Sequence, residues 1–471
     1  MTKRKPTCMG FGTLIPNWTV VNSESDGHLF RIGRTTMPNW TKTTEGYLPR
    51  HAEARISTAL QDTRIVALVG PRQSGKTTLA RRFADDEQRP FITLDDEQFR
   101  RFAQDDPVGF MRGQRGAVID EIQRAPGLIL ELKKQVDDDP TPGRYLITGS
   151  VELFRSAISP DSLAGRVETI ELLPFSQAEA TVADVPNFLE RAFVANFPHL
   201  ATTGPTDNLV ERVVSGGFPE VLARPDPVRR HSWLRAYARS LAERDISDIA
   251  AISKLDQMTA LIDQASVSAS QLVNLSDLGS KLRVDGKTVE RWLTLLERIY
   301  VIRRVGAWHR NERKRLIKTP KLQFLDSGLL AALRRIDQTA IERNRESLGP
   351  LLECFAYTEI AKAVALHGEP ITISHYRDKD GAEVDLVLER SPGEVVGIEV
   401  KAGATVRPDD FKPLTRLEAA AGDQFVCGVL LHDGERIQQT ASKMFAMPIK
   451  MLWESGSPAV GATQTYEGIS G

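Results

Sequence analysis

The chain has 471 residues and a formal net charge of −1, with 41% hydrophobic and 26% charged residues. This composition is ordinary for a globular protein and excludes a mainly disordered, collagenous or coiled-coil chain. At roughly 100–200 residues per domain, the length predicts about two to four domains.

Cysteine usage and apolar runs indicate the compartment. The three cysteines lie far apart and have no zinc-type or disulfide-type spacing, which favours a reducing environment. No apolar run approaches the roughly 18–20 residues of a membrane-spanning helix. The basic start of the chain is not followed by an apolar stretch of signal-peptide length. We therefore expect a cytoplasmic protein without a membrane partner.

Residues 1–45 lack sustained periodicity and predict a poorly ordered leader. From residue 46, apolar strands alternate with helices, which predicts a parallel sheet covered on both faces. The following segment has the apolar spacing of helices, and a helix-turn-helix pattern comes after it. In the C-terminal part, a helix precedes three strands, a helix and a further strand. The expected units are a P-loop core at 46–178, a helical lid at 179–265, a winged-helix module at 266–340, a C-terminal α/β domain at 341–455 and a flexible tail at 456–471.

Residues 70–77 read GPRQSGKT, which matches the phosphate-loop pattern G-x-x-x-x-G-K-[ST] between an apolar strand and a helix. Gly70 and Gly75 let backbone N–H groups point at phosphate oxygens. Lys76 supplies a positive charge, and the Thr77 hydroxyl is a Mg²⁺ ligand. The pattern predicts ATP and Mg²⁺ as cofactors. The expected nucleotide-binding residues of the loop are Gly70, Pro71, Arg72, Gln73, Ser74, Gly75, Lys76, Thr77 and Thr78.

Polar residues at the ends of later strands complete the expected ATP site. Asp120 ends the apolar strand of GAVIDE and is predicted to hold the metal, while Glu121 would polarise the attacking water. At the end of the next strand, Thr148 or Ser150 would place a hydroxyl near the terminal phosphate; a polar turn is the alternative. Arg166 is a candidate for stabilising transition-state charge, either within the chain or on a neighbouring subunit of a homo-oligomer.

The segments LVGPRQSGKTTLARRF, VIDEIQRAP, YLITGS, LAGRVETIELLPFSQAE and GGFPEVL together resemble one family. It comprises bacterial and archaeal AAA-type ATPases with a C-terminal nuclease-like domain. The resemblance implies that another strand separates the Asp120 strand from the phosphate-loop strand. It also implies that the turn at 216–219 is similar to a lid turn beside the nucleotide; a plain tight turn is the alternative.

Residues 272–326 carry thirteen basic and six acidic side chains, a net charge of +7. The sequence of this segment resembles a winged helix, in which Lys287 and Arg291 would enter the major groove of DNA. Arg313, Lys314 and Arg315 would contact phosphates. The alternative is a lid module with a solvated basic face.

Three C-terminal residues fall on neighbouring predicted strands. Asp385 lies within one strand, and Glu399 and Lys401 are two residues apart on the next, so their side chains share a face. Two carboxylates and a lysine suit a Mg²⁺ site beside an attacked phosphate, with Lys401 as a catalytic residue. The pattern resembles the restriction-endonuclease-like core, and Glu353 on the preceding helix matches a further acidic position. Val384 stands where that pattern often has proline.

Two functions remain open from the sequence. One is a Mg²⁺-dependent ATPase that acts on DNA or RNA, or is regulated by it, through the winged helix and the nuclease-like domain. The other is a nucleotide-dependent switch whose C-terminal domain binds a partner without catalysis. ATP turnover that nucleic acid stimulates would favour the first function.

Overall fold

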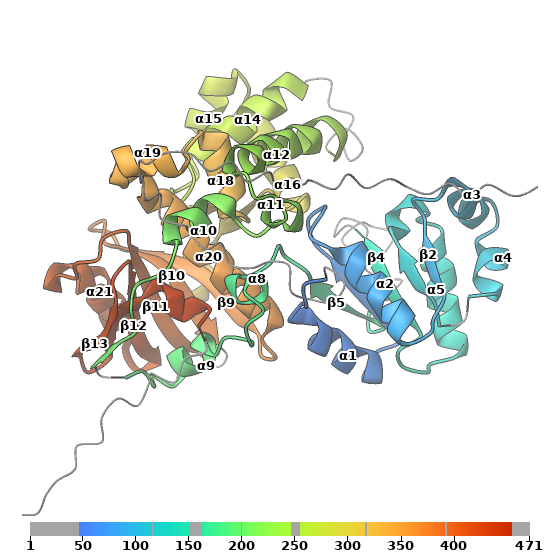
Figure 1. Cartoon of the computed structure of the whole chain (residues 1–471), viewed down its shortest axis with the longest axis horizontal. Helices are drawn as coiled ribbons and strands as arrows, with labels where there is room; N and C mark the ends of the chain where they lie inside the picture. Colours follow the sequence, from blue (N-terminus) through green and yellow to red (C-terminus); the bar gives the residue numbers. More distant parts are fainter. Residues whose placement is uncertain are drawn as a thin grey trace, which may run out of the picture. The chain divides into compact units, whose positions relative to one another are not determined.

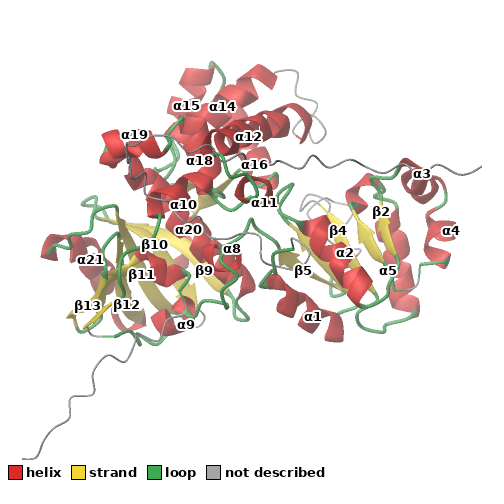
Figure 2. Ribbon diagram, in the orientation of Figure 1, coloured by secondary structure: helices red, strands yellow, loops and turns green. Residues whose placement is uncertain are grey.

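The structure is a computed structural model, and it describes residues 47–114, 116–149, 163–198, 200–245, 255–315, 318–390 and 393–454. The expected leader at 1–45 and the expected tail at 456–471 lie outside these ranges. Figure 1 shows the elements in chain order, and Figure 2 separates helices from strands. The α/β class with a parallel sheet is confirmed.

The first sheet contains five parallel strands in the order β2-β3-β4-β1-β5. Because β4 lies between β1, which leads into the phosphate loop, and β3, which ends at Asp120, the strand separation implied by the family resemblance is present. The strands are β1 (Ile65–Val69), β2 (Phe91–Thr93), β3 (Val118–Asp120), β4 (Tyr145–Gly149) and β5 (Val167–Glu171).

Helices cover both faces of this sheet. Ile65 and Ala67 of β1 pack in one buried cluster with α5, whereas Val66 and Leu68 pack in a second cluster with α1 and α2. Burial on both faces explains why the strand is continuously apolar rather than alternating. The helices are α1 (Ala52–Asp62), α2 (Lys76–Asp86), α3 (Glu97–Asp105), α4 (Pro107–Arg112) and α5 (Leu128–Asp138), with a 3-10 turn at Ile122–Arg124.

The segment expected to form the lid contributes to two regions. Its α9 packs on the C-terminal sheet, and its β6 pairs with β13 at one edge of that sheet. Helices α10, α12 and α14 pack against α18. The elements are α8 (Gln177–Ala180), α9 (Phe188–Phe193), β6 (Leu200–Thr202), α10 (Leu209–Ser215), α11 (Pro219–Leu222), α12 (Pro227–Ser240), a π-helical turn (Leu241–Asp245) and α14 (Leu255–Val267).

Two helices and a two-stranded antiparallel ribbon follow, at the positions expected for the winged-helix text. Residues 312–315, which carry the expected phosphate contacts Arg313, Lys314 and Arg315, form a short helix. The elements are α15 (Leu275–Leu282), α16 (Gly286–Arg298), β7 (Ile302–Val305), α17 (Glu312–Arg315), β8 (Lys321–Phe324), α18 (Ser327–Arg334) and α19 (Gln338–Arg343), with a 3-10 turn at Arg345–Ser347.

The C-terminal sheet has the order β6-β13-β14-β12-β11-β10-β9, with β9, β10 and β11 antiparallel and β11, β12 and β14 parallel. Helix α20 packs on one face and α21 on the other. Three strands follow α21, where one was expected. The elements are α20 (Leu348–Leu366), β9 (Ile371–Arg377), β10 (Glu383–Arg390), β11 (Glu394–Lys401), α21 (Lys412–Ala421), β12 (Phe425–His432), β13 (Arg436–Ala441) and β14 (Met444–Pro448), with 3-10 turns at Pro408–Phe411, Gly422–Gln424 and Ile449–Leu452.

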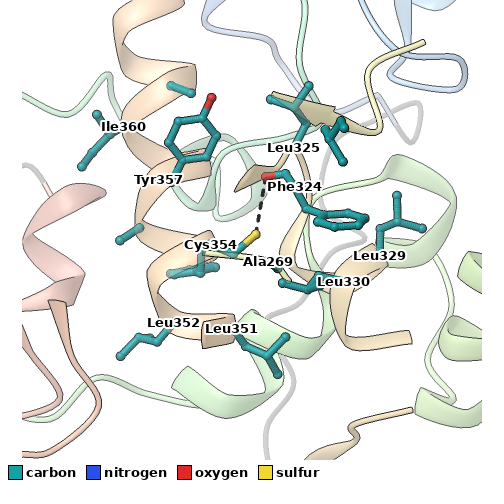
Figure 3. Packing of buried hydrophobic residues seen from close by; sticks show 14 of the residues in the cluster. Ala269, Phe324, Leu325, Leu329, Leu330, Leu351, Leu352, Cys354, Tyr357 and Ile360 are labelled. Carbon is teal, nitrogen blue, oxygen red and sulfur yellow. Dashed lines mark hydrogen bonds between the residues drawn. The ribbon is translucent and has the colours of Figure 1, made fainter. Parts of the chain in front are cut away.

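A buried cluster joins β8 to α20, and Figure 3 shows it from close by. Figure 3 shows the Phe324 ring, at the end of β8, beside Leu329 and Leu330 of α18, with its carbonyl facing Cys354 of α20. The Cys354 thiol donates to the Phe324 carbonyl at 3.4 Å, and burial raises the pKa of this thiol. Strand β8 is therefore held against the helix of the C-terminal domain that carries Glu353.

Candidate functional site

The phosphate loop has the backbone that its glycines require. Gly70 has φ 151°, and a Cβ there would lie 2.2 Å from the Leu172 carbonyl oxygen. Gly75 has φ 96° and directly precedes α2. Both positions therefore favour glycine for steric reasons.

Within the loop, the Lys76 ammonium donates to the Gly70 carbonyl at 3.0 Å and to the Pro71 carbonyl at 2.7 Å. The Ser74 hydroxyl oxygen is buried without a hydrogen-bond partner among the described residues. A buried hydroxyl and an ammonium held by loop carbonyls can both be satisfied by phosphate oxygens. The donor set therefore fits a polyphosphate. Thr77 and Thr78 are exposed on the first turn of α2.

The buried carboxylate of Asp120 accepts three threonine hydroxyls. Thr77 Oγ1 donates at 3.0 Å and Thr148 Oγ1 at 2.7 Å to one carboxylate oxygen, and Thr93 Oγ1 donates at 3.0 Å to the other. The structure thus brings together Thr77, Asp120 and Thr148. Thr93 was missed in the sequence because its role depends on β2 pairing with β3, where Thr93 lies opposite Asp120.

Glu121 follows Asp120 with φ 57°, which is uncommon for a residue with a side chain. Its backbone N–H donates to Thr148 Oγ1 at 3.0 Å, and its carboxylate accepts from the Gln123 amide. The side chain is half-buried. Glu121 and Asp120 are therefore both tied to Thr148 at the edge of the sheet that faces the loop.

Arg166 lies elsewhere. It precedes β5, and β5 runs parallel to β1 with Val167 opposite Ile65, so Arg166 lies where β1 begins. The phosphate loop follows the other end of β1, roughly 16 Å away at about 3.3 Å per residue. The guanidinium pairs with Asp137 at 2.5 Å and 3.1 Å. Arg166 does not approach the ATP site of its own chain here, so only the neighbouring-subunit alternative stays a prediction.

A cavity of about 370 Å³ lies beside the loop. Gly75 and Thr78 form one side, and Phe175 and Pro219 contribute from later segments. The backbone N–H of Phe175 donates to the Gly217 carbonyl at 2.8 Å, so the 216–219 turn packs against Phe175. The residues that line the cavity are Tyr47, Leu48, Arg50, Gly75, Thr78, Phe175, Pro219, Glu220, Leu222 and Ala223.

Arg50 connects the loop to this cavity. Its buried guanidinium donates to the Ser74 carbonyl at 2.7 Å and the Leu173 carbonyl at 2.6 Å, and lies 4.4 Å from the centre of the Phe175 ring. It also pairs with Glu179 at 3.0 Å. Burial would raise the pKa of Glu179, but Arg50 and backbone donors hold that pKa below its ordinary value. No local pattern marks Arg50, because the partners of its guanidinium are all distant in sequence.

Helix α12 also contacts the loop. The Tyr237 hydroxyl donates to the Arg72 carbonyl at 3.0 Å, whereas the Arg72 side chain is exposed. The helical segment that follows the 216–219 turn therefore touches the backbone of the phosphate loop directly.

The expected C-terminal residues form one cluster. Asp385 and Glu399 lie on paired antiparallel strands, in which Leu386 is opposite Ile398. Asp385 accepts the Val400 N–H at 2.9 Å, and Glu399 pairs with Lys401 at 2.7 Å. The other oxygen of Glu399 is buried without a hydrogen-bond partner among the described residues.

A lysine absent from the sequence prediction lies in this cluster. Lys321, at the start of β8, is 2% exposed and pairs with Glu353 at 2.6 Å, Glu383 at 2.8 Å and Asp385 at 3.2 Å. In the described ranges, no three histidine, cysteine or acidic side chains are arranged to hold a metal ion. The expected metal ligands are thus brought together, but Lys321 lies among them.

Burial and mutual repulsion perturb these carboxyl groups. Burial and the charge of Asp385 raise the pKa of Glu353 to about 8, although Lys321 opposes the shift. The same two causes raise the pKa of Glu399 to about 7, against the effect of Lys401. Burial alone would lower the pKa of Lys321, but Asp385, Glu353 and Glu383 raise it, so Lys321 is charged.

The expected nucleic-acid contacts are in different situations. Lys287 and Arg291 are exposed four residues apart on α16, and Arg313 is exposed. Arg315 instead pairs with Glu389 and donates to the His309 carbonyl at 2.6 Å. The Lys314 side chain lies outside the described part of the structure.

Beside this region is a groove of about 580 Å³ with several basic side chains. His375 contributes a buried ring whose Nδ1 has no hydrogen-bond partner in the described part of the chain. The basic lining residues are His309, Arg310, Lys318, His375, Arg377 and Lys379.

Among the described helices, none combines the length and the apolar character that a membrane crossing requires.

Comparisons with known proteins divide the chain into three matched segments. A family model described as an AAA domain matches residues 62–181. Two models described as domains of unknown function, DUF8612 and DUF4143, match residues 206–340 and 348–452. These descriptions identify the first segment and assign no activity to the other two.

Relatives extend over most of the chain. Uncharacterised proteins of Mycobacterium bovis and Mycobacterium tuberculosis are each 30% identical over 413 residues, which cover 87% of this chain and 85% of each relative. The solved structure of a Walker-type ATPase of Pyrococcus abyssi is 17% identical, covers 62% of this chain and 97% of that chain, and has a TM-score of 0.39. The chain therefore belongs to the same family as the two mycobacterial proteins, and its residues 62–181 form an AAA-type P-loop ATPase domain.

Proposed function

We propose that the AAA-type domain binds ATP with Mg²⁺ and hydrolyses it. The observation that carries this proposal is the Asp120 carboxylate, held by the Thr77 and Thr148 hydroxyls beside the phosphate loop. Thr77 and Asp120 would hold Mg²⁺, and the ion would supply positive charge to the phosphate oxygens.

The phosphate loop would bind the triphosphate. Lys76 would exchange the carbonyl oxygens of Gly70 and Pro71 for phosphate oxygens, and the buried Ser74 hydroxyl would gain an acceptor. Charged hydrogen bonds to phosphate are stronger than those to neutral carbonyls, which favours the exchange. The N-terminus of α2 adds its dipole.

The cavity beside Gly75 is the candidate site for the nucleotide base of ATP. Phe175 and Leu222 supply apolar surface, and Tyr47 supplies an aromatic ring with a polar tip. Because the cavity adjoins the first turn of α2, a nucleotide in the loop would extend into it. The 216–219 turn supports this assignment, since Pro219 lines the same cavity.

Glu121 is the candidate general base. Its backbone is tied to Thr148, which also binds Asp120, so the metal ligand and the base share one support. The Gln123 amide holds the carboxylate, and releasing this contact would allow Glu121 to accept a proton from water. Arg166 would act only on a neighbouring subunit of a homo-oligomer.

Nucleotide binding and phosphate release test this proposal on one preparation. Lys76→Ala should lose nucleotide binding, and Glu121→Gln should bind ATP but hydrolyse it at least about 100-fold more slowly. Glu97→Gln is the matched control, because Glu97 lies on the exposed surface of α3 and pairs with Arg101. An unchanged rate in Glu121→Gln would contradict the role of this residue.

We also propose that the ATPase acts on DNA or RNA through its later segments. The supporting observation is the basic groove, whose Arg377 contacts Glu383, a partner of Lys321 in the carboxylate cluster, together with the exposed Lys287 and Arg291. In a nuclease-like reaction, Asp385, Glu399 and Glu353 would hold Mg²⁺, and Lys401 would stabilise charge on the attacked phosphate.

The alternative is a nucleotide-dependent switch with a C-terminal domain that only binds a partner. The Lys321 contacts favour this alternative, because they occupy carboxylates that a nuclease would use for metal. ATP turnover and cleavage should be measured with and without single- and double-stranded DNA and RNA. Stimulated turnover supports the first function, whereas tight nucleotide binding with little turnover and no nucleic-acid effect supports the switch.

A further inference from the structure

We propose that Lys321 is the internal cation of the C-terminal carboxylate cluster, and that a divalent cation binds there only after Lys321 has been withdrawn. The inference rests on the proposed role of Asp385, Glu399 and Glu353 as metal ligands, and it adds a control on their access to metal. Lys321 belongs to β8, outside the segment that contains the other members of the cluster.

The position of the Lys321 ammonium is the first argument. It lies 2.6 Å from Glu353, 2.8 Å from Glu383 and 3.2 Å from Asp385, with the side chain almost fully buried. Oxygen ligands surround Mg²⁺ and Ca²⁺ at about 2.0–2.6 Å. An ammonium in contact with the same oxygens fills the volume that such an ion needs, so the two cations exclude each other.

The charge balance is the second argument. Four carboxylates, those of Glu353, Glu383, Asp385 and Glu399, meet the ammonium groups of Lys321 and Lys401. Arg377 adds a longer contact to Glu383 at 3.9 Å. One buried Glu399 oxygen has no hydrogen-bond partner among the described residues, so these cations do not satisfy every ligand atom there. A divalent ion in place of Lys321 would supply one more positive charge.

The attachment of β8 explains how Lys321 could be held or released. On one side, Phe324 belongs to the buried cluster that includes α20, and its carbonyl accepts a hydrogen bond from the Cys354 thiol. On the other, the Thr319 carbonyl meets His375 Nε2 at 3.2 Å, and Lys318 donates to the Arg377 carbonyl at 3.0 Å. These contacts join residues 318–319, directly before β8, to β9 next to the cluster. Because Lys321 also pairs with Val305 of β7, we expect β7 and β8 to move together when these contacts break, which would withdraw Lys321.

Mn²⁺ binding to the full-length protein without nucleotide tests the inference. Lys321→Met removes the ammonium and keeps much of the side-chain volume, so this variant should bind Mn²⁺ at least about tenfold more tightly than the unmodified protein. Lys443→Met is the matched control, because Lys443 lies in the same domain and donates to the Phe425 carbonyl. The phosphate loop is identical in all three proteins, so any difference reports on the cluster.

Two further variants guard against misfolding and adventitious binding. Glu383→Gln removes one partner of Lys321 but keeps Glu353, Asp385 and Glu399, so it should also tighten Mn²⁺ binding. Adding Asp385→Asn to Lys321→Met should remove the gain. Equal Mn²⁺ affinity in the unmodified protein, Lys321→Met and Glu383→Gln would overturn the inference.

Cleavage assays on the same variants separate this inference from the nuclease proposal. If Lys321→Met binds Mn²⁺ tightly but cleaves no nucleic acid, the inference about the internal cation stands and the nuclease proposal fails. If the unmodified protein cleaves nucleic acid and binds Mn²⁺ as tightly as Lys321→Met does, the nuclease proposal stands and the inference about the internal cation fails.

Discussion

Asp120 ends strand β3 and Asp385 lies within strand β10, but the groups around the two carboxylates differ in charge. Asp120 accepts three neutral hydroxyls, from Thr77, Thr93 and Thr148. Asp385 faces the charged ammonium of Lys321 and other carboxylates. A hydroxyl leaves the charge of a carboxylate available to an incoming ion, whereas an ammonium already neutralises it.

The difference separates a site prepared for metal from a site closed to metal. At Asp120, Mg²⁺ would join a carboxylate whose hydroxyl partners include a further ligand, Thr77. At Asp385, a metal would have to displace a lysine that has three carboxylate partners. The same ligand chemistry therefore predicts binding in one domain and exclusion in the other.

The largest expected effect comes from removing the internal cation. Lys321→Met without divalent ions should lower the free energy of unfolding by about 3–5 kcal/mol, because it leaves buried carboxylates without their counter-ion. Chemical denaturation in EDTA measures this loss. Adding Glu353→Gln should recover part of it, and an unchanged midpoint in Lys321→Met would show that the lysine is not needed for charge balance.

A second prediction concerns pH. The pKa of Glu399 in the folded protein is about 7, above its ordinary value, so the folded state binds the extra proton more tightly. The resulting stability is fully present below about pH 4.3 and is lost as pH rises through 7. Between pH 5 and pH 8, the unmodified protein in EDTA should lose on the order of 1–3 kcal/mol that Glu399→Gln does not lose. Parallel curves for the two proteins would contradict this.

A smaller effect is expected at the ATP site. Thr93→Val removes one of the three hydroxyls on buried Asp120 and should cost about 1–2 kcal/mol of unfolding free energy without nucleotide. Thr58→Val is the control, since its exposed hydroxyl donates only to the backbone of α1. Equal losses in the two variants would mean that the Asp120 contact has no special weight.

The smallest effect concerns nucleic acid. Arg313 is exposed, so Arg313→Ala should reduce the slope of log affinity against log salt by about 0.9 if the side chain contacts a duplex phosphate. Arg315→Ala should change stability rather than this slope, because Arg315 already pairs with Glu389. An unchanged slope in Arg313→Ala would assign its surface to the lid alternative.

The sequence predicted elements in which local signals agree. The phosphate loop has a complete pattern between a strand and a helix, and the segment expected to form a helix-turn-helix contains α15 and α16. The neighbours of Asp120 could be anticipated because parallel strands bring their carboxyl ends to one edge of a sheet. Thr148 follows from that rule, whereas the separation of β1 from β3 was implied only by the family resemblance.

Long-range contacts could not be predicted in the same way. Lys321 is 32 residues before Glu353 and 64 before Asp385, so no spacing links them. Arg50 is 129 residues from Glu179. Arg166 failed to reach the ATP site of its own chain because it precedes its strand, whereas the loop follows a parallel strand. Each case depends on how distant elements pack rather than on a local motif.

Phosphate release by the unmodified protein and by Asp120→Asn tests the central claim most directly, because Asp120 is the residue on which the proposed Mg²⁺-ATP site converges. With Mg²⁺ and ATP, the unmodified protein should complete many turnovers, and Asp120→Asn should be at least about 100-fold slower while it keeps the same fold. Equal rates in the two proteins, or no Mg²⁺-dependent turnover in the unmodified protein, would contradict the account.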